Sequence, residues 1–127
     1  MTGSIRLAIP SNGQGGFDAE RSGHFGHCDC FTLVDMEDGE VGAIQIIDNP
    51  PHESGGCLRP VQLLAGHGVT ALVVAGMGAR PLAGFNDVGI VVYFDSVTPG
   101  VGEVVRIVAD GGLPQMDAGN VCGGGGH

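Results

Sequence analysis

The sequence predicts an α/β domain built on a mixed five-stranded sheet, antiparallel on one side and parallel on the other. Two observations carry this prediction. Residues 5–48 alternate apolar and polar positions with a hairpin signal between two of the runs, which is typical of antiparallel strands. From residue 57 onward, helical spacing alternates with fully apolar runs, which indicates strands covered on both faces and joined through helices.

The first half of the chain supplies three of the five strands. Residues 5–10, "IRLAIP", alternate in polarity, and the glycine-rich loop "SNGQGG" follows them. Residues 30–35 and 41–48 are two further strands, and the Asp38-Gly39 pair between them is a strong hairpin signal. We expect the acidic group around this turn, which includes Asp35, to be a solvated hairpin end. The paired prolines in "NPPHESGG" then exclude regular structure.

The second half alternates helices and strands. Residues 57–68 have apolar residues at helical spacing, with Pro60 in the first turn and Gly68 at the end. The fully apolar run "VTALVVAG" is a strand, "ARPLAGFND" a short helix, "GIVVYFD" a strand, and "GVGEVVRIVAD" a third helix. We see no internal repeat.

Composition sets limits on organisation. We expect one domain over residues 1–110 and a flexible Gly-rich tail over 111–127, because "GNVCGGGGH" cannot bury enough surface to order itself. No leader is visible, and no run approaches the roughly 20 apolar residues of a membrane span, so we expect a cytoplasmic protein with reduced thiols.

The charge limits the choice of ligand. Fourteen acidic residues stand against five arginines, which gives a formal charge of −9. A surface this acidic lacks the electrostatic footprint for a polyanion, so nucleic acid is not an expected partner. No carboxylate pair or Ser–His–Asp spacing supports acid–base or nucleophilic catalysis, and we expect the protein not to be an enzyme.

The stretch "SGHFGHCDCF" concentrates soft ligands. It contains His24, His27, Cys28 and Cys30, and an extended backbone would point the two sulfurs to the same side. The spacing matches neither the paired Cys-x2-4-Cys of structural zinc sites nor the Cys-x-x-Cys of thioredoxin chemistry. Ordinary loop histidines and small buried cysteines are the alternatives to a metal site.

Three further segments carry candidate ligands. His52 and Cys57 lie before the first helix, whose N-terminus favours a thiolate at Cys57. The "AGMGAR" turn, with Gly76, Met77 and Gly78, follows a buried strand, and its glycines allow backbone amides to approach a ligand. The tail holds a further candidate ligand, Cys122.

The order of "IRLAIPSN", "GHFGHCDCFTLVD", "IIDNP", "QLLAGHGVTALVVAGMGARPLAGFNDVGIVVYF" and "PGVGEVV" resembles the dinitrogenase iron–molybdenum cofactor biosynthesis family. That family includes NifX-like proteins, the C-terminal domain of NifB and the orange protein of sulfate reducers. The resemblance covers about residues 5–110. Its most specific parts are "HFG-x-C" and the "GMG" turn.

The resemblance implies a three-layer ribonuclease-H-like α/β fold that carries a metal–sulfur cluster, of the iron–sulfur or molybdenum–copper sulfide type. It implies that His24 and Cys28 belong to the cluster motif and that the turn at 76–78 lines the pocket. His27 stands where the family commonly has arginine, and Cys30 where it has an aromatic residue. "PHESGGC-x-x-P" resembles a branch of the family associated with P-loop ATPases of the iron–sulfur scaffold type.

These observations predict a carrier or scaffold for a metal–sulfur cluster in cofactor biosynthesis or metal handling. Its expected metal ligands come from the three histidine- and cysteine-bearing segments: His24, His27, Cys28, Cys30, His52, Cys57 and Cys122. The alternative is a regulatory or interaction module that binds a single zinc, copper or nickel ion through Cys and His. Whether two copies share ligands in a homodimer is left open.

Overall fold

A computed structural model describes residues 4–22, 28–48, 58–75, 79–95 and 97–111. The predictions for residues 23–27, 49–57 and 76–78 and for the tail from residue 112 concern residues outside this part of the chain. The described residues form five strands and three helices, in the order β1 (Ser4–Ser11), β2 (Cys30–Glu37), β3 (Glu40–Asp48), α1 (Leu58–Gly66), β4 (Ala71–Val74), α2 (Ala79–Asp87), β5 (Val91–Phe94) and α3 (Val101–Ala109).

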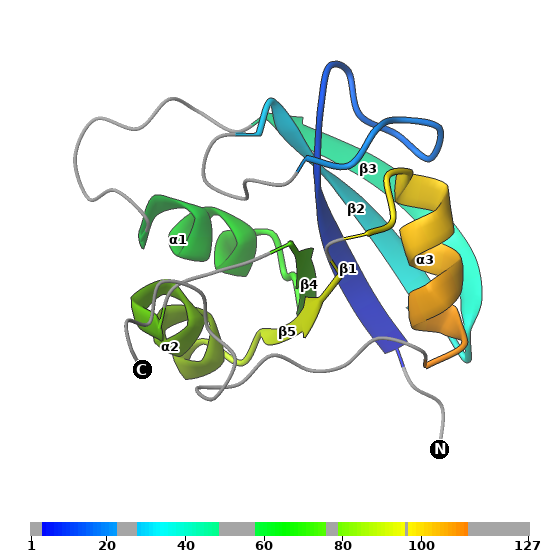
Figure 1. The fold of residues 1–127 in the computed structure, drawn as a ribbon. Helices are drawn as coiled ribbons and strands as arrows, with labels where there is room; N and C mark the ends of the chain where they lie inside the picture. The colour runs from blue at the N-terminus through cyan, green and yellow to red at the C-terminus, as the bar shows by residue number, and fades with distance from the viewer. Residues whose placement is uncertain (1–3, 23–27, 49–57, 76–78, 96, 112–127) are drawn as a thin grey trace.

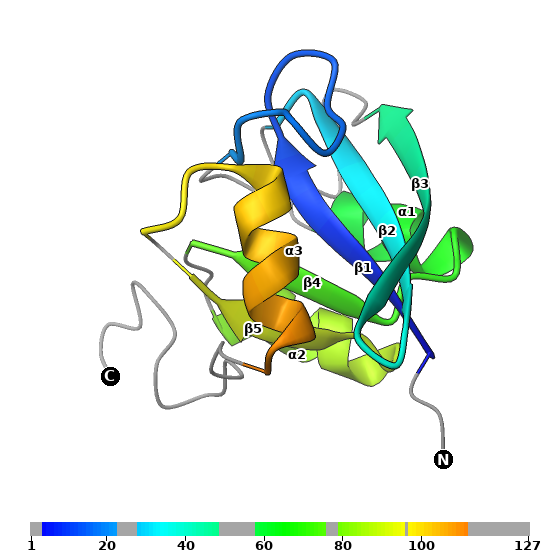
Figure 2. The same cartoon turned by 90° about the vertical axis from the view of Figure 1, so that its right-hand side faces the viewer.

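The sheet has the strand order β3-β2-β1-β4-β5. The pairs β1·β2 and β2·β3 are antiparallel, whereas β1·β4 and β4·β5 are parallel. Helices α1 and α2 cover one face of this sheet and α3 covers the other (Figures 1 and 2). The predicted three-layer α/β fold with a mixed five-stranded sheet is therefore confirmed.

The hairpin between β2 and β3 forms as the Asp38-Gly39 pair predicts. Glu37 pairs with Glu40, which leaves a two-residue loop. Asp38 has a φ of 54° and Gly39 a φ of 82°, so both central residues are left-handed. This geometry matches the right-handed twist of the flanking strands, and it explains why this dipeptide sets the register.

The two helix–strand units, 58–74 and 79–95, are built alike. Each begins with Arg-Pro at its second and third positions and has glycine at its eleventh. Gly68 and Gly89 have φ values of 76° and 84°. Each helix ends in the same cap of two backbone hydrogen bonds, one donated by this glycine and one by the residue after it. The two units thus form a short structural repeat, which corrects the sequence-based view that the chain has none.

The caps also join each helix to the core. The Val69 N–H donates to the Leu64 carbonyl, 3.1 Å away, and the Ile90 N–H donates to the Phe85 carbonyl, 2.9 Å away. All four side chains are buried in the same core cluster. The hydrogen bond that ends the helix therefore brings an aliphatic residue of the following segment against the helix it has just left.

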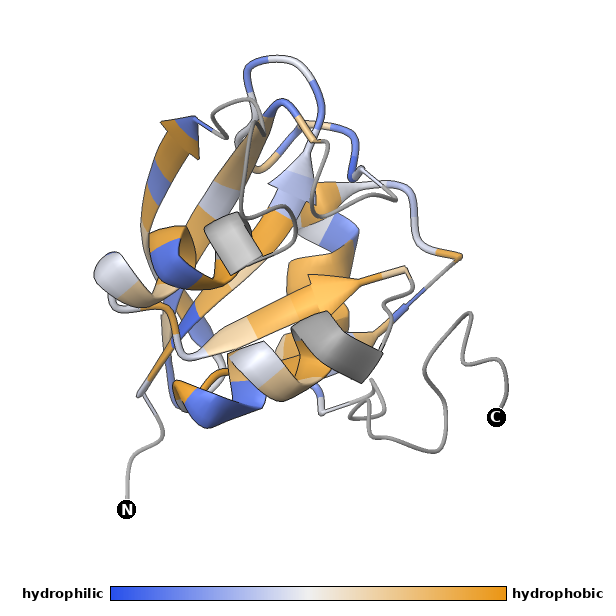
Figure 3. Ribbon diagram, turned by 90° about the vertical axis from the view of Figure 1, so that its left-hand side faces the viewer, coloured by the Kyte–Doolittle hydropathy of each residue, from blue (hydrophilic) through white to orange (hydrophobic). Residues whose placement is uncertain are grey.

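Two apolar clusters fill the space between the layers. The larger lies between the sheet and α1–α2, and the smaller lies between the sheet and α3. Figure 3 shows the strands as hydrophobic along most of their length. Leu7 and Ile9 of β1 face α3, and Ala8 faces the other helices, so β1 is buried on both sides. No helix in the described ranges is both long and apolar enough to cross a membrane.

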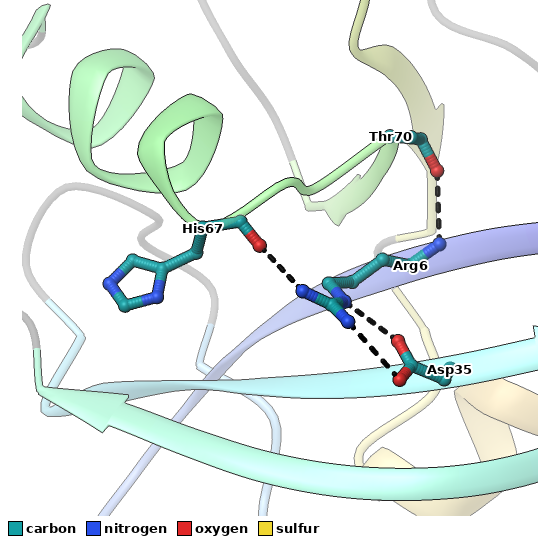
Figure 4. A network of polar contacts seen from close by, with 4 residues as sticks. All are labelled: Arg6, Asp35, His67 and Thr70. Atoms are coloured by element: carbon teal, nitrogen blue, oxygen red, sulfur yellow. Dashed lines mark hydrogen bonds and ion pairs between the residues drawn. The ribbon is translucent and has the colours of Figure 1, made fainter.

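Near the amino end of β1, Arg6 joins this strand to β2 and to the connection between α1 and β4 (Figure 4). Its Nε and Nη2 donate to the two carboxylate oxygens of Asp35, 2.7 and 3.3 Å away, and its Nη1 donates to the His67 carbonyl, 2.8 Å away. The Arg6 backbone N–H donates to the Thr70 hydroxyl, 3.0 Å away. The hydrogen bond and charge of Asp35 raise the pKa of Arg6. Asp35 is thus an ion-pair partner, and the expectation of a purely solvated acidic turn was wrong for it.

Alanine substitution will distinguish a left-handed cap glycine from a helical one. Gly89→Ala should lower the free energy of unfolding by about 1–2 kcal/mol, because a left-handed backbone brings Cβ against the following carbonyl. Gly66→Ala should raise it by about 0.4–1 kcal/mol, because Gly66 ends α1 with open space around it. Urea denaturation measures both. Equal effects of the two substitutions would contradict this account of the cap.

Candidate functional site

Three of the segments that carry candidate ligands join the described structure at one end of the sheet, whereas the tail with Cys122 follows α3. The parallel strands β1 and β4 have their carboxyl ends there, and in the antiparallel ladders Ser11 pairs with Cys30, which pairs with Asp48. Segment 23–27 lies between Ser22 and Cys28, segment 49–57 starts after Asp48, and segment 76–78 follows β4. The topology therefore brings the attachment points of all three to what we call the carboxyl end of the sheet.

Cys28 lies on the side of the sheet that α1 and α2 cover. Its side chain is 5% exposed and belongs to the same core cluster as Val61 in α1. Helix α1 begins at Leu58, the residue after Cys57. The Cys28 thiol and the first turn of α1 thus belong to one layer of the molecule.

Cys30 lies on the opposite face, beneath the glycine-rich loop that follows β1. A Cβ atom built on Gly15 would lie 2.7 Å from the Cys30 Sγ, so only glycine lets the backbone pass over this sulfur. The Sγ lies 3.6 Å from the Gly13 carbonyl, to which the thiol donates. Burial, reinforced by the nearby charges of Asp29 and Asp48, raises the pKa of Cys30. The thiol is therefore held protonated and covered.

The expectation that Cys28 and Cys30 share a face was wrong. Alternation with period two holds only inside a regular strand, and β2 begins at Cys30. The chain bends at Asp29, whose backbone N–H donates to the Ser11 carbonyl and whose carboxylate accepts from the Gly13 N–H. This bend turns Cys28 toward α1, while Cys30 stays with Thr32 on the α3 side.

All the other predicted ligands lie outside the described residues. They are His24, His27, His52, Cys57, Gly76, Met77, Gly78 and Cys122. Among the residues that the structure does describe, no three His, Cys, Asp or Glu side chains converge as a metal-ion site. Cys28 is accordingly the described residue on which a test of the site can be built.

The loop 12–16 is more than the spacer that its composition suggests. The Gly16 N–H donates to the Thr32 hydroxyl at 3.0 Å, and the hydroxyls of Thr32 and Ser11 lie 2.7 Å apart. With the Gly13–Asp29 bond, these contacts fold the loop down over β2. The sequence signal for this arrangement is the group of small and hydroxyl residues around three glycines, whose meaning depends on pairing with a distant strand.

A second unexpected feature is the clamp on segment 17–22, which leads into the histidine motif. Arg21 donates through its backbone N–H to the Pro99 carbonyl and through Nε to the Thr98 carbonyl, both 2.7 Å away. Asp95 accepts from the backbone N–H groups of Val97 and Thr98 at 2.9 and 3.1 Å. Asp95 thus fixes the conformation of the loop after β5. The carbonyls of this loop in turn bind Arg21 and so hold segment 17–22 in place.

Opposing effects set the pKa of Asp95. Burial would raise it, but hydrogen bonds from Thr98 and Val97 and the charge of Arg21 outweigh burial and lower it. Within the described structure, Nη1 of Arg21 and Oδ2 of Asp95 are buried without a hydrogen-bond partner. The sequence signal for the clamp is an aspartate directly after a buried strand.

This architecture defines a class: a small three-layer α/β protein in which histidine- and cysteine-bearing segments join the carboxyl end of a mixed sheet. The model of the dinitrogenase iron-molybdenum cofactor family matches residues 4–111, and the chain belongs to that family. Membership of this family associates the chain with cofactor biosynthesis and metal handling, and it confirms the family resemblance of the sequence motifs.

Individual proteins are similar to this chain in sequence or in fold over most of its length. An uncharacterized protein of Methanocaldococcus jannaschii is 31% identical over 116 residues, which are 89% of this chain and 92% of that protein. The apo orange protein of Desulfovibrio gigas has a TM-score of 0.75 at 26% identity, over 88% of this chain and 92% of that one. A NifB-type protein from Thermotoga has a TM-score of 0.70 at 26% identity, covering 87% of this chain and 92% of its own.

The clamp gives a prediction for acidic pH. Because the folded-state pKa of Asp95 is lowered, its carboxylate stabilises the fold above the ordinary value of 3.8, and this contribution is lost as the pH falls through the folded-state pKa. Asp95→Asn should therefore lower the free energy of unfolding at pH 7 by about 1–3 kcal/mol, and the difference should shrink toward pH 3. The exposed Asp18→Asn is the control with the same change in charge. A gap that stays constant with pH in urea denaturation would contradict the role of the charge.

Proposed function

We propose that this protein is a non-enzymatic carrier or scaffold that binds a metal–sulfur cluster at the carboxyl end of the sheet. The observation that carries the proposal is the common attachment of segments 23–27, 49–57 and 76–78 at this end, with the buried Cys28 thiol beside the first of them. The relatedness to the orange protein and to the NifB-type protein supports the same role.

The proposed ligands divide by chemistry. Thiolates suit iron, copper and molybdenum–sulfur units, so Cys28 and Cys57 are the proposed sulfur ligands. The start of α1 at Leu58 supports a thiolate at Cys57, since the first turn of a helix carries a partial positive charge. His24, His27 and His52 would add nitrogen ligands or hydrogen bonds. Cys122 would cap the site from the tail.

The turn after β4 would contribute backbone donors. Gly76, Met77 and Gly78 connect the carboxyl end of β4 to the start of α2. Backbone N–H groups before a helix suit a negatively charged ligand such as a bridging sulfide. The turn would thus contact the inorganic part of the cluster, while the cysteines bind the metals.

Cys30 is not among the ligands that we now propose. A ligand thiol must lose its proton, and the burial and neighbouring carboxylates of Cys30 raise its pKa. The loop over its sulfur also separates it from the face on which Cys28 lies. We propose instead that Cys30 is a small core residue in the space beneath the glycine loop.

A carrier of this kind takes its cluster from one protein and gives it to another. The proposed partners are a P-loop ATPase of the iron–sulfur scaffold type and other cofactor-biosynthesis proteins, as the "PHESGGC" stretch suggests by resemblance. The cysteines have to be reduced for this role, which is the state the cytoplasm maintains.

Anaerobic reconstitution tests the proposal with paired cysteine variants. Protein incubated with iron and sulfide, or with tetrathiomolybdate and copper, should keep visible absorption and stoichiometric metal and sulfide after desalting. Cys28→Ala should lower the retained cluster at least about tenfold, because it removes a metal ligand. Cys30→Ala should retain the cluster as the unchanged protein does.

The controls separate ligation from folding. Both variants remove one buried thiol and keep an apolar side chain, and circular dichroism melting confirms that each is folded. Equal cluster retention by the two variants would overturn the role of Cys28. One metal ion per chain without acid-labile sulfide would overturn the cluster and indicate the single-ion module instead.

A further inference from the structure

The edge strand β3 has a row of apolar side chains, here called the apolar stripe. The stripe lies on the face of the sheet on which α3 packs against the more central strands. Val41, Ile44 and Ile46 are 44%, 42% and 45% exposed. Ile44 and Val41 pair with Val34 and Met36 of β2, both of which pack in the α3 cluster. Figure 2 shows β3 at the edge of the sheet, beside β2. The stripe therefore continues the apolar cluster beneath α3 outward to the last strand of the sheet.

A bulge in β3 keeps this stripe on one face. Val34 pairs with Ile44, but Met36, two residues on, pairs with Val41, three residues back, so β3 contains one extra residue. Without the bulge, Val41 and Ile44 would point to opposite faces, because strand side chains alternate. The bulge brings three large apolar side chains into one row.

The other face of the same strand borders an acidic groove of about 810 Å³. The carboxylates of Glu37, Asp38 and Glu40 line it, together with the Arg6–Asp35 pair. Among the described residues that line the groove, Arg6 is the only basic one, and its guanidinium already binds both Asp35 oxygens and the His67 carbonyl. The groove consequently keeps a net negative charge.

We propose that the outer edge of β3 receives an extended segment of another protein in which apolar and basic residues alternate. In the described structure β3 pairs with β2 only, so one side of its backbone is open to another strand. Side chains of an added strand alternate between the two faces. Apolar ones would lie over the stripe, and the basic ones between them would reach the groove.

The charges of this chain argue against two other occupants. In an antiparallel pair of β3 strands from two copies centred on Ile44, Glu40 of each copy would face Asp48 of the other, and like charges opposite each other destabilise a sheet. Residues 112–127 contain no lysine or arginine and include Asp117, so this segment does not supply the cations that the groove needs.

The test uses synthetic peptides and the full-length protein. The probe is a fluorescein-labelled nine-residue peptide in which arginine and valine alternate, and the control is the same peptide with glutamate in place of arginine. The arginine peptide should bind in fluorescence anisotropy titrations, and its affinity should fall as the salt concentration rises. Binding should also shift the NMR amide signals of β3. The glutamate peptide should not bind.

Paired variants locate the site. Glu40→Lys should weaken binding about fivefold, whereas Asp87→Lys, an equal change of charge at the end of α2, should leave it unchanged. The double change Ile44→Thr with Ile46→Thr should weaken it about tenfold and keeps side chains that favour strands. Val88→Thr, at a residue that is 48% exposed outside β3, should have no effect.

Three results would overturn the proposal. They are equal binding of the glutamate peptide, chemical-shift changes outside β3 and its groove, and β3 signals that change with protein concentration in the absence of peptide. The last result would show self-association of this chain. Each is independent of whether the protein binds a metal–sulfur cluster, because the stripe and groove contain none of the proposed ligands.

Discussion

The structure depends on the position of β1, which pairs antiparallel with β2 on one side and parallel with β4 on the other. This arrangement determines which strand ends lie next to one another. The carboxyl ends of β1, β3 and β4 and the start of β2 all come to the same end of the sheet. A strand in the central position must be apolar on both faces, and Leu7, Ala8 and Ile9 meet that requirement with no exposed surface. The burial of these three aliphatic residues therefore decides where the segments with candidate ligands are attached.

Local sequence signals were sufficient to predict the elements. Asp38-Gly39 predicted the hairpin because few other dipeptides accept two left-handed residues, and Gly68 predicted the end of α1 for a related reason. The relation between Arg6 and Asp35 could not be predicted this way, because they become neighbours only when β1 and β2 pair. The clamp of Arg21 by Thr98 likewise joins residues 77 positions apart.

The two described cysteines show how one bend places similar residues in different surroundings. Cys28 and Cys30 are two positions apart and both are buried, yet the chain bends at Asp29 and directs them to opposite faces. On one face the thiol lies in the layer where α1 begins. On the other, a loop with glycine at its closest approach covers the sulfur and keeps its proton in place. The sequence pattern identified both cysteines as candidates, and the turn geometry decided their surroundings.

The acidity of the chain constrains how it would hold the proposed metal–sulfur cluster if that cluster is anionic. A formal charge of −9 repels a negatively charged cluster at long range, so basic side chains cannot be the main source of binding free energy. Coordinate bonds from deprotonated thiols, with backbone amides at the glycine turn, act at short range and are little affected by net charge. The same acidity has the opposite effect at the outer edge of β3, where it attracts a basic partner to a surface separate from the proposed ligands. One charge distribution thus favours short-range ligation at the carboxyl end of the sheet and long-range attraction at its side.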